Sequence, residues 1–245
     1  MRVFIGFDIR EPRSYLITRY SLLKHSTVDI DVRKLGIRRL LANGIYTRQW
    51  SLNDDNQRID SRDGKPFSTE FSFTRFLVPY LCDYRGWALF VDGDFLFTQD
   101  VARLFSYQDD QYAVQVVKHN HHPVEKTKMD DVIQTRYFRK NWSSLVLWNC
   151  GHPSNMKLSP YLVNHATGQY LHAFSWLQPD EIGTLPRGWN FLAGVEKVPP
   201  NLPNAIHYTL GTPEFEALKD GPYANIWLDE WNEYSAKRQK EFANG

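Results

Sequence analysis

The sequence is poor in the features that mark secreted, membrane and nucleic-acid-binding proteins. Only two of its 245 residues are cysteines, too few for a disulfide framework, so we expect Cys82 and Cys150 to be buried free thiols in a reducing compartment. No stretch approaches the roughly 18 apolar residues of a membrane span. The net charge of +1 supplies no basic field for nucleic acid. These absences favour a cytoplasmic protein with neither a transmembrane segment nor a nucleic-acid partner.

What is present is typical of a soluble α/β protein. The hydrophobic fraction of 42% and the charged fraction of 23% suit a chain with a large core. The first residues, MRVFIGFD, lack the long apolar region of a signal peptide and are typical of a first strand. Strand and helix patterns alternate without a linker, which predicts one domain over residues 1–245 that ends in a charged helix and tail over 226–245.

The expected elements follow from hydrophobic periodicity and capping residues. The expected strands are Val3–Phe7, Val28–Leu35, the strand ending at Val91, Tyr112–Val117, Ser144–Trp148, Phe191–Lys197 and Ala205–Tyr208. The expected helices are Arg13–Lys24, a short one near Arg38–Ala42, Ser68–Leu81, Val101–Ser106, Ser159–His165 and Ile226–Phe242. Residues 36–66 are otherwise expected to form a long loop.

The segment WALFVDGD, Trp87 to Asp94, is the most informative part of the chain. Its apolar run predicts a strand buried on both faces, and ligands of open α/β sheets collect at the carboxyl ends of such strands. Side chains at i and i+2 point the same way, so Asp92 and Asp94 can face one ligand and hold Mg²⁺ or Mn²⁺ against a phosphate. Gly93 would let a sugar or ribose approach the backbone. The alternative is an Asp-Gly turn whose charges are merely solvated.

The order of these features resembles a known family. After a first strand ending in Phe7-Asp8 come FTRFLVPYL (Phe73 to Leu81), FVDGDFLF, LPRGWN (Leu185 to Asn190) and IHYTLGTPEF (Ile206 to Phe215). This order is similar to that of the metal-dependent nucleotide-sugar glycosyltransferases with the GT-A fold, and in particular to the retaining group that includes glycogenin and the lipopolysaccharide galactosyltransferases. The resemblance implies a Rossmann-like fold with a mixed central sheet flanked by helices.

The resemblance also implies roles for individual residues. Asp92, Asp94 and His207 would bind Mn²⁺, and Asp92 would also lie near the ribose. Arg75 would neutralise the diphosphate and touch the donor sugar. Phe7 and Asp8 would meet the base, commonly uracil. Asn149 would lie beside the sugar pocket. Gly211 lies in a turn that could aim backbone N–H groups at phosphate.

The sequence departs from the family pattern in three places. The family carries a lysine shortly after the late glycine, where this chain has Thr212-Pro213-Glu214, so either Lys219 substitutes or Arg75 and the metal suffice. His152-Pro153 follows Asn149-Cys150-Gly151 in place of an apolar pair, which leaves the donor sugar open. Family members also carry an acidic residue and an amide residue near the reacting sugar carbon, and Gln178 to Glu181 match this motif only loosely.

Each candidate also has a structural explanation. Arg75 could be a surface cation, His207 a structural histidine and Asn149 a plain turn residue. Asp180 could contact the anomeric carbon as a catalytic residue or cap a helix. An inverting enzyme would need a carboxylate as general base, and retention is implied by the resemblance alone.

Two further segments are expected to be peripheral. The tract Lys118 to His122 resembles a metal site but lacks paired cysteines, so we interpret it as a solvated loop near the acceptor. Arg136 to Lys140 forms a basic and aromatic patch that could contact an anionic acceptor or make a peripheral membrane contact, although a solvated face is the usual explanation.

These observations predict a hexosyltransferase that moves a sugar from a nucleotide diphosphate donor, with UDP-sugar expected, to a hydroxyl of a saccharide or lipid-linked acceptor. A haloacid-dehalogenase phosphatase also uses an aspartate-x-aspartate, but there it opens the first strand. A sugar nucleotidyltransferase needs a glycine-rich basic loop, where this chain has Asp8 to Pro12. A non-catalytic sugar-binding or nucleotide-binding protein on the same scaffold is disfavoured by the intact set of candidate ligands.

Overall fold

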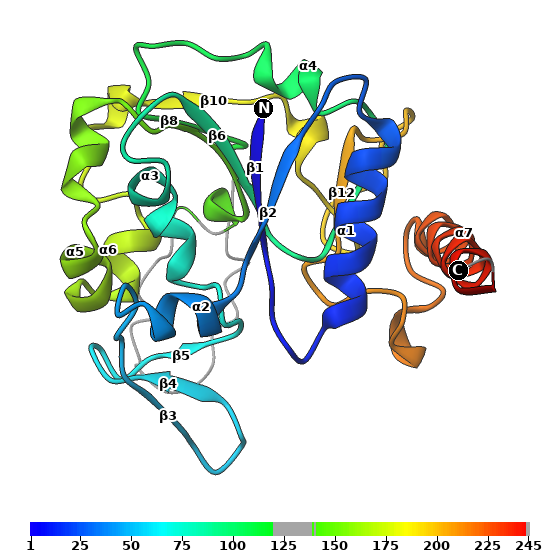
Figure 1. The fold of residues 1–245 in the computed structure, drawn as a ribbon, viewed down its shortest axis with the longest axis horizontal. Helices are drawn as coiled ribbons and strands as arrows, with labels where there is room; N and C mark the ends of the chain where they lie inside the picture. The colour runs from blue at the N-terminus through cyan, green and yellow to red at the C-terminus, as the bar shows by residue number, and fades with distance from the viewer. Residues whose placement is uncertain (120–138, 140, 244–245) are drawn as a thin grey trace.

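The computed structural model describes residues 1–119, 139 and 141–243. Its centre is a mixed sheet with the strand order β10-β8-β9-β6-β1-β2, in which β9 runs antiparallel to both of its neighbours and the other pairs are parallel (Figure 1). Its strands are β1 (Arg2–Gly6), β2 (Asp31–Leu35), β6 (Trp87–Val91), β8 (Val114–Val116), β9 (Leu145–Asn149) and β10 (Ile182–Thr184).

The central strands are buried on both faces because alternate side chains enter different apolar clusters. Phe4, Phe90 and Val146 pack on one face against Phe76 and Trp148. The residues between them point to the other face, as the two-residue period of a strand requires. There they pack in one cluster with side chains of α1 and β7. These residues are Val3, Ile5, Leu89, Val91, Leu145 and Leu147. The continuous apolar runs in the sequence therefore serve two cores, one on each side of the sheet.

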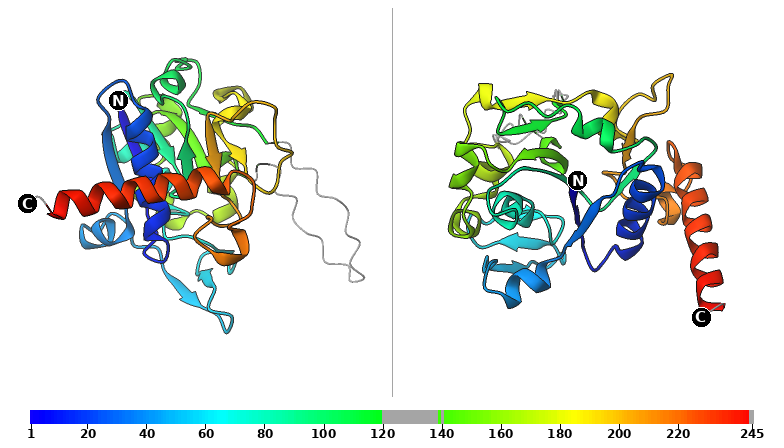
Figure 2. Two further views of the ribbon diagram at one scale, coloured as in Figure 1. Left: turned by 90° about the vertical axis from the view of Figure 1, so that its right-hand side faces the viewer. Right: turned by 45° about the horizontal axis from the view of Figure 1, so that its top comes forward.

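Helices cover both faces. The α-helices are α1 (Pro12–His25), α2 (Ile37–Ala42), α3 (Val78–Leu81), α4 (Ala102–Phe105), α5 (Pro160–His165), α6 (Gly168–His172) and α7 (Ala224–Ala243). The 3-10 helices are η1 (Thr74–Leu77), η2 (Trp142–Ser144), η3 (Pro153–Lys157), η4 (Pro179–Glu181), η5 (Arg187–Trp189) and η6 (Glu216–Leu218). Figure 2 shows α7 lying across the outer side of α1, where Lys24 pairs with Glu230 and Glu233.

Two smaller sheets complete the fold. One has the order β11-β12-β7 and comprises β11 (Phe191–Leu192), β12 (Ala205–His207) and β7 (Phe95–Phe97). The other has the order β3-β4-β5 and comprises β3 (Trp50–Leu52), β4 (Arg58–Asp60) and β5 (Pro66–Phe67). In the first sheet, β7 begins directly after Asp94. The second sheet begins at Trp50 and occupies the later part of the loop expected over residues 36–66.

The helix expected over Ser68–Leu81 is wrong in its first half. Residues 70–73 form turns, and the chain then enters η1 and α3. Pro79 lies in the first turn of α3 and has no N–H to donate to a preceding carbonyl, so the helix restarts there instead of running through. The other expected elements are present with shifted ends; among them, the Ser159 side chain caps α5 by accepting from Leu162 N–H at 3.2 Å.

Candidate metal and nucleotide-sugar site

Asp92 and Asp94 lie at the carboxyl end of β6, where the chain turns into β7. The Thr18 hydroxyl of α1 donates to the Gly93 carbonyl at 2.8 Å and accepts from Phe95 N–H at 3.0 Å, so α1 fixes this turn. A Cβ on Gly93 would lie 2.4 Å from the Gly6 carbonyl oxygen. The close approach of β1 therefore requires a glycine at this position, and the contact of Gly93 with a sugar or ribose stays a prediction.

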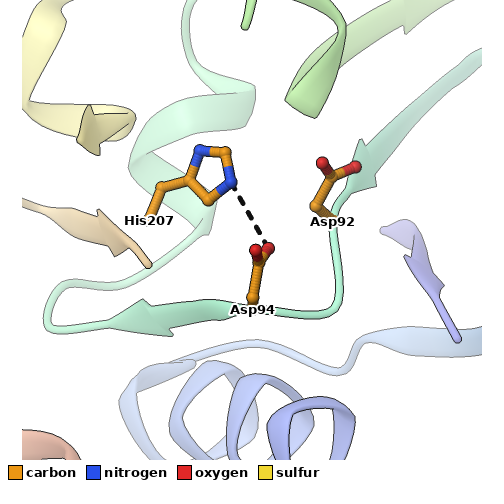
Figure 3. Close-up of side chains that lie close together, drawn as sticks. All are labelled: Asp92, Asp94 and His207. Atoms are coloured by element: carbon orange, nitrogen blue, oxygen red, sulfur yellow. Dashed lines mark ion pairs between the residues drawn. The ribbon is translucent and has the colours of Figure 1, made fainter. Parts of the chain in front are cut away.

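The structure brings together the predicted ligands Asp92, Asp94 and His207. One ligand atom from each lies within 4.8 Å of the others, and His207 Nε2 is 3.4 Å from Asp94 Oδ1 (Figure 3). His207 stands on β12, in register with Phe95 of β7, and its ring stacks on the Phe95 ring at 4.4 Å between centroids. The antiparallel pairing of β7 with β12 therefore carries the imidazole to the acidic turn.

Asn190 determines which nitrogen of His207 faces the carboxylates. The amide group of Asn190 donates through Nδ2 to Ser144 Oγ at 2.9 Å and to the Asn141 carbonyl at 3.3 Å, so its Oδ1 points toward His207. The distance from His207 Nδ1 to this oxygen is 3.0 Å. Since an amide oxygen only accepts, Nδ1 carries the proton and Nε2 presents a lone pair, which is the usual arrangement of a metal-binding histidine.

Arg75 is a buried partner of Asp92 and not a surface cation. Its Nη1 lies 2.8 Å from Asp92 Oδ1 and donates to the Ser143 carbonyl at 2.8 Å, while Nε donates to the Phe71 carbonyl at 3.2 Å. The side chain is 6% exposed, against 14% for Asp92 and 22% for Asp94. The acidic side chains therefore reach solvent while the arginine behind them is enclosed.

The electrostatics of the site favour a cation. Burial raises the pKa of Asp92 to about 7, against the opposing charge of Arg75, and Asp94 adds to the rise. Burial also lowers the pKa of the Arg75 guanidinium, and the two carboxylates oppose this shift. Asp94 Oδ1 is buried without a hydrogen bond within the described residues, and the buried Asp92 Oδ1 has only its ion pair with Arg75. Two carboxylates beside an imidazole lone pair form a donor set that fits Mn²⁺ or Mg²⁺.

Asp8 follows β1 at the same edge of the sheet, but its carboxylate is already occupied. Arg58 of β4 donates to Oδ2 at 3.0 Å, Arg10 Nη2 does so at 3.2 Å and Glu70 N–H at 3.1 Å, while Arg10 N–H donates to Oδ1 at 2.9 Å. Burial acts to raise the pKa of Asp8, yet these hydrogen bonds outweigh it and leave that pKa below its usual range. Asp8 thus ties the small β3-β4-β5 sheet to β1. Phe7 beside it is partly exposed, with Lys34 Nζ 4.4 Å from its ring centre.

The structure places two predicted site residues at the opposite edge of the sheet. β9 runs antiparallel to β6, so Asn149 pairs with Trp87 while Leu145 pairs with Val91 beside Asp92. Asp180 precedes β10, whose first residue, Ile182, pairs with Val114 at that same far edge. The length of a strand, on the order of 10 Å, separates both from the acidic turn. The expectations that Asn149 lines the sugar pocket and that Asp180 acts at the anomeric carbon are therefore wrong.

Gly211 adopts a φ of 114° in a turn after β12, and its N–H donates to the Tyr208 carbonyl at 2.8 Å. This amide is not available to a phosphate, which corrects the expected role of Gly211. Lys219, the alternative phosphate partner, forms an exposed ion pair with Glu216. In the tract from Lys118 to His122 the structure describes only the first two residues, and in the patch from Arg136 to Lys140 it describes only Arg139. The remaining parts of these two predictions lie outside the described residues.

Three residues at the site carried no predicted role. The Ser144 carbonyl accepts from Asp92 N–H at 2.9 Å, Ser143 receives Arg75, and Asn190 orients His207. Ser143 and Ser144 stand where β9 begins, at the near edge of the sheet. The direction of β9 was the missing information, because the end of a strand that reaches the site depends on whether its pairing is parallel or antiparallel.

A curated protein of known sequence resembles the chain along almost its full length. The chain is 46% identical over 247 residues to Protein CDI of Arabidopsis thaliana, covering 99% of this chain and 90% of that protein. The chain belongs to the Protein CDI family. No family model matches the sequence.

Solved structures show the fold of this member of the Protein CDI family. The bifunctional glycosyltransferase WbbM matches with a TM-score of 0.60 at 15% identity, covering 94% of this chain and 49% of that one. GlyE of Streptococcus pneumoniae TIGR4 matches with a TM-score of 0.58 at 16% identity, covering 97% and 64%. The galactosyltransferase LgtC, solved with donor and acceptor sugar analogs, matches with a TM-score of 0.58 at 11% identity, covering 95% and 96%.

The fold of this chain is therefore that of the GT-A glycosyltransferases, which confirms the predicted fold class. The chain spans about half of the WbbM chain and just under two thirds of the GlyE chain. Among the described residues, no helix has both the length and the apolar character needed to cross a bilayer.

Proposed function

We propose that this protein is a metal-dependent glycosyltransferase, built as one GT-A domain, that transfers a hexose from a nucleotide diphosphate sugar to a hydroxyl acceptor. The observation that carries the proposal is the convergence of Asp92, Asp94 and the Nε2 lone pair of His207 within 4.8 Å. The GT-A fold supports it, because this group stands at the carboxyl edge of the sheet, where ligands of such sheets bind.

The residues suit the departure of a diphosphate. When bound by Asp92, Asp94 and His207, a divalent cation would supply positive charge to the leaving phosphate oxygens. Arg75 holds Asp92 from behind and adds a second, buried positive charge that needs no reorganisation during the reaction. Asn190 keeps His207 in the metal-binding tautomer.

The proposal also names the chemical classes of the donor and the acceptor. We expect a uridine diphosphate sugar, with Phe7 at the base and Asp8 acting through the arginines that it holds. A saccharide or lipid-linked saccharide is the expected acceptor, transfer is expected to proceed with retention, and the two buried free thiols agree with a cytoplasmic location.

A thermal-shift experiment tests the proposal. The wild-type protein is melted with UDP, GDP or ADP and with UDP-glucose or UDP-galactose, each with Mn²⁺ and with EDTA. We expect stabilisation by the uridine compounds that requires Mn²⁺, since a ligand that binds only the folded state raises its melting temperature. The variant Asp94→Ala should lose this response and the metal-dependent hydrolysis of the sugar nucleotide. The exposed Asp54→Asn is the matched control and should keep both.

Sugar-nucleotide hydrolysis that proceeds undiminished in EDTA would contradict the proposal. Metal-dependent binding of UDP-sugars without any hydrolysis or transfer would instead favour the non-catalytic binding protein.

A further inference from the structure

His119 carries a buried ring nitrogen with no hydrogen-bond partner among the described residues. The residue is 5% exposed, and its Nε2 is fully buried and unbonded. This corrects the expectation that the tract beginning at Lys118 is solvated at this position. Buried polar side-chain atoms are nearly always hydrogen-bonded, so an orphan atom of this kind calls for a partner that the described part of the chain does not supply.

His119 lies at the same edge of the sheet as the acidic turn. β8 and β6 both run antiparallel to β9, with Val116 opposite Val146 and Val91 opposite Leu145. Asp92 directly follows β6 and His119 stands three residues after the end of β8. One strand, β9, separates β8 from β6, which puts them about 10 Å apart at normal strand spacing. The Trp142 indole N–H donates to the His119 carbonyl at 3.1 Å and fixes its backbone beside the start of β9.

A carboxylate that follows β11 orients the ring. Glu196 Oε1 lies 3.2 Å from His119 Nδ1. Glu196 is itself held by Arg187 Nε at 2.9 Å and by Leu192 N–H at 3.3 Å. Leu192 of β11 is in register with His207 of β12, so the group that orients His119 is anchored beside the candidate metal ligand.

These contacts determine what the free nitrogen can do. Nδ1–H donates to Glu196, which leaves Nε2 with its lone pair. Burial lowers the pKa of His119, opposed by Glu196 and reinforced by His207, so the ring is neutral near pH 7. A neutral imidazole with a free lone pair accepts a hydrogen bond, and the matching donor at a glycosyl-transfer site is a hydroxyl group.

We propose that His119 is a saccharide-binding residue whose Nε2 accepts a hydrogen bond from a sugar hydroxyl, with Glu196 as its positioning residue. The inference rests on the proposed function and specifies one contact within it. A buried site built to pair with a hydroxyl strongly rejects a ligand without one, so this contact also selects the ligand. The hydroxyl belongs either to the sugar of the donor or to the saccharide acceptor.

Two substitutions of His119 are compared with the wild-type protein. His119→Phe keeps the shape of the ring and removes the acceptor, whereas His119→Gln offers an amide oxygen near the position of Nε2. Calorimetry measures binding of UDP, UDP-glucose and UDP-galactose in the presence of Mn²⁺. A glycan array, probed in the presence of UDP and Mn²⁺, measures binding of saccharide acceptors.

We expect His119→Phe to bind UDP as the wild type does and to lose about tenfold or more in affinity for the matching UDP-sugar, with His119→Gln restoring part of the loss. This outcome assigns the hydroxyl to the donor. Unchanged UDP-sugar affinity together with loss of a wild-type glycan-array signal assigns it to the acceptor. Glu196→Gln, which keeps the volume of the side chain but not its charge, should weaken the same ligand as His119→Phe.

The inference is overturned if wild type and His119→Phe bind the UDP-sugars and the glycan array with equal affinity. It is also overturned if His119→Phe loses affinity for UDP and UDP-sugar equally, because that would indicate a structural role. These results leave the proposed function intact, because the wild type still binds UDP with Mn²⁺. A wild-type protein that binds neither UDP nor a UDP-sugar would remove the proposed function and this contact with it. If His119→Phe does not fold, the comparison of Glu196→Gln with wild type decides by the same criteria.

Discussion

Asn190 and His207 share a 3.0 Å hydrogen bond between Oδ1 and Nδ1, and this contact aims the opposite ring nitrogen at Asp94. Asn190 is completely buried, and its amide orientation is set in turn by Ser144 at the start of β9. The candidate metal site therefore depends on a chain of contacts that runs from the central sheet through an amide to an imidazole.

Replacing Asn190 with leucine should weaken metal binding without removing a ligand. Loss of the acceptor frees the His207 ring to rotate or change tautomer, and losing such a supporting contact costs about 10-fold to 100-fold in metal affinity. Titration calorimetry with Mn²⁺ in the presence of UDP measures the effect. The matched control is Asn155→Leu, because Asn155 is also fully buried but binds Ala113 and Asn149 at the far edge of the sheet. Equal Mn²⁺ affinity in Asn190→Leu and wild type would contradict this role.

Removing Arg75 should destabilise the protein by leaving Asp92 buried beside Asp94 without its cation. Breaking a buried ion pair from one side costs about 3 kcal/mol or more, which corresponds to a fall in melting temperature of roughly 6–12 °C for a chain of this size. Arg75→Met tests this by thermal unfolding in EDTA. The double variant Arg75→Met with Asp92→Asn should recover part of the loss, because the stranded charge is gone. A double variant that is less stable than Arg75→Met would refute the explanation.

Gly93 should not tolerate a methyl group. The Cβ of an alanine would lie 2.4 Å from the Gly6 carbonyl oxygen, so β1 or the acidic turn must move. Overpacking of this kind costs about 1–3 kcal/mol, and the displacement of the turn should also weaken Mn²⁺ binding. The control is Gly36→Ala, where a new Cβ would lie at an ordinary 3.7 Å from its nearest neighbour, Phe7 Cδ1. Denaturant unfolding of both variants should separate them, and comparable stability would speak against the packing argument.

His172 should make the fold sensitive to mild acid. Burial, with the charges of Arg75 and Arg48, lowers the pKa of His172 to about 3 from its ordinary 6.5. Between these values the unfolded chain binds a proton that the folded chain does not, so the contribution to stability is present above pH 6.5 and decreases as the pH falls. From roughly pH 7.5 to 5.5 the loss is at most about 1.4 kcal/mol, since the ring retains some exposure.

Urea unfolding of wild type and His172→Gln at these two pH values isolates this group from other titrations. The wild type should lose more stability than the variant on acidification. An identical pH dependence in the two proteins would show that His172 is not held neutral by its surroundings.

The acidic turn could be predicted from the sequence because its signal is local. An apolar run that ends in Asp92-Gly93-Asp94 predicts a buried strand, and it places the two carboxylates at the carboxyl end of that strand. His207 was found through the resemblance, since a single histidine in a short strand has no local signature. The small β3-β4-β5 sheet was missed because strands of two or three residues are too short to show alternation.

Asn149 and Asp180 were misplaced for a topological reason. Both stand next to correctly predicted strands, but a residue at the end of a strand reaches the site only if that end meets the correct edge of the sheet. The direction of β9 and the pairing of β10 with β8 are long-range facts that periodicity does not contain. The burial of His119 was missed for a similar reason, since the ring contacts Glu196, which comes from a distant part of the chain.

The candidate ligands stand on the turn between β6 and β7 and on β12, segments that are far apart along the chain and adjacent in space. A cation bound by both segments would be a reversible cross-link between distant parts of the polypeptide. Bound cation should therefore slow amide exchange and proteolysis around β12 and its neighbours. Occupancy of the site would then affect the kinetic stability of the fold as well as its chemistry.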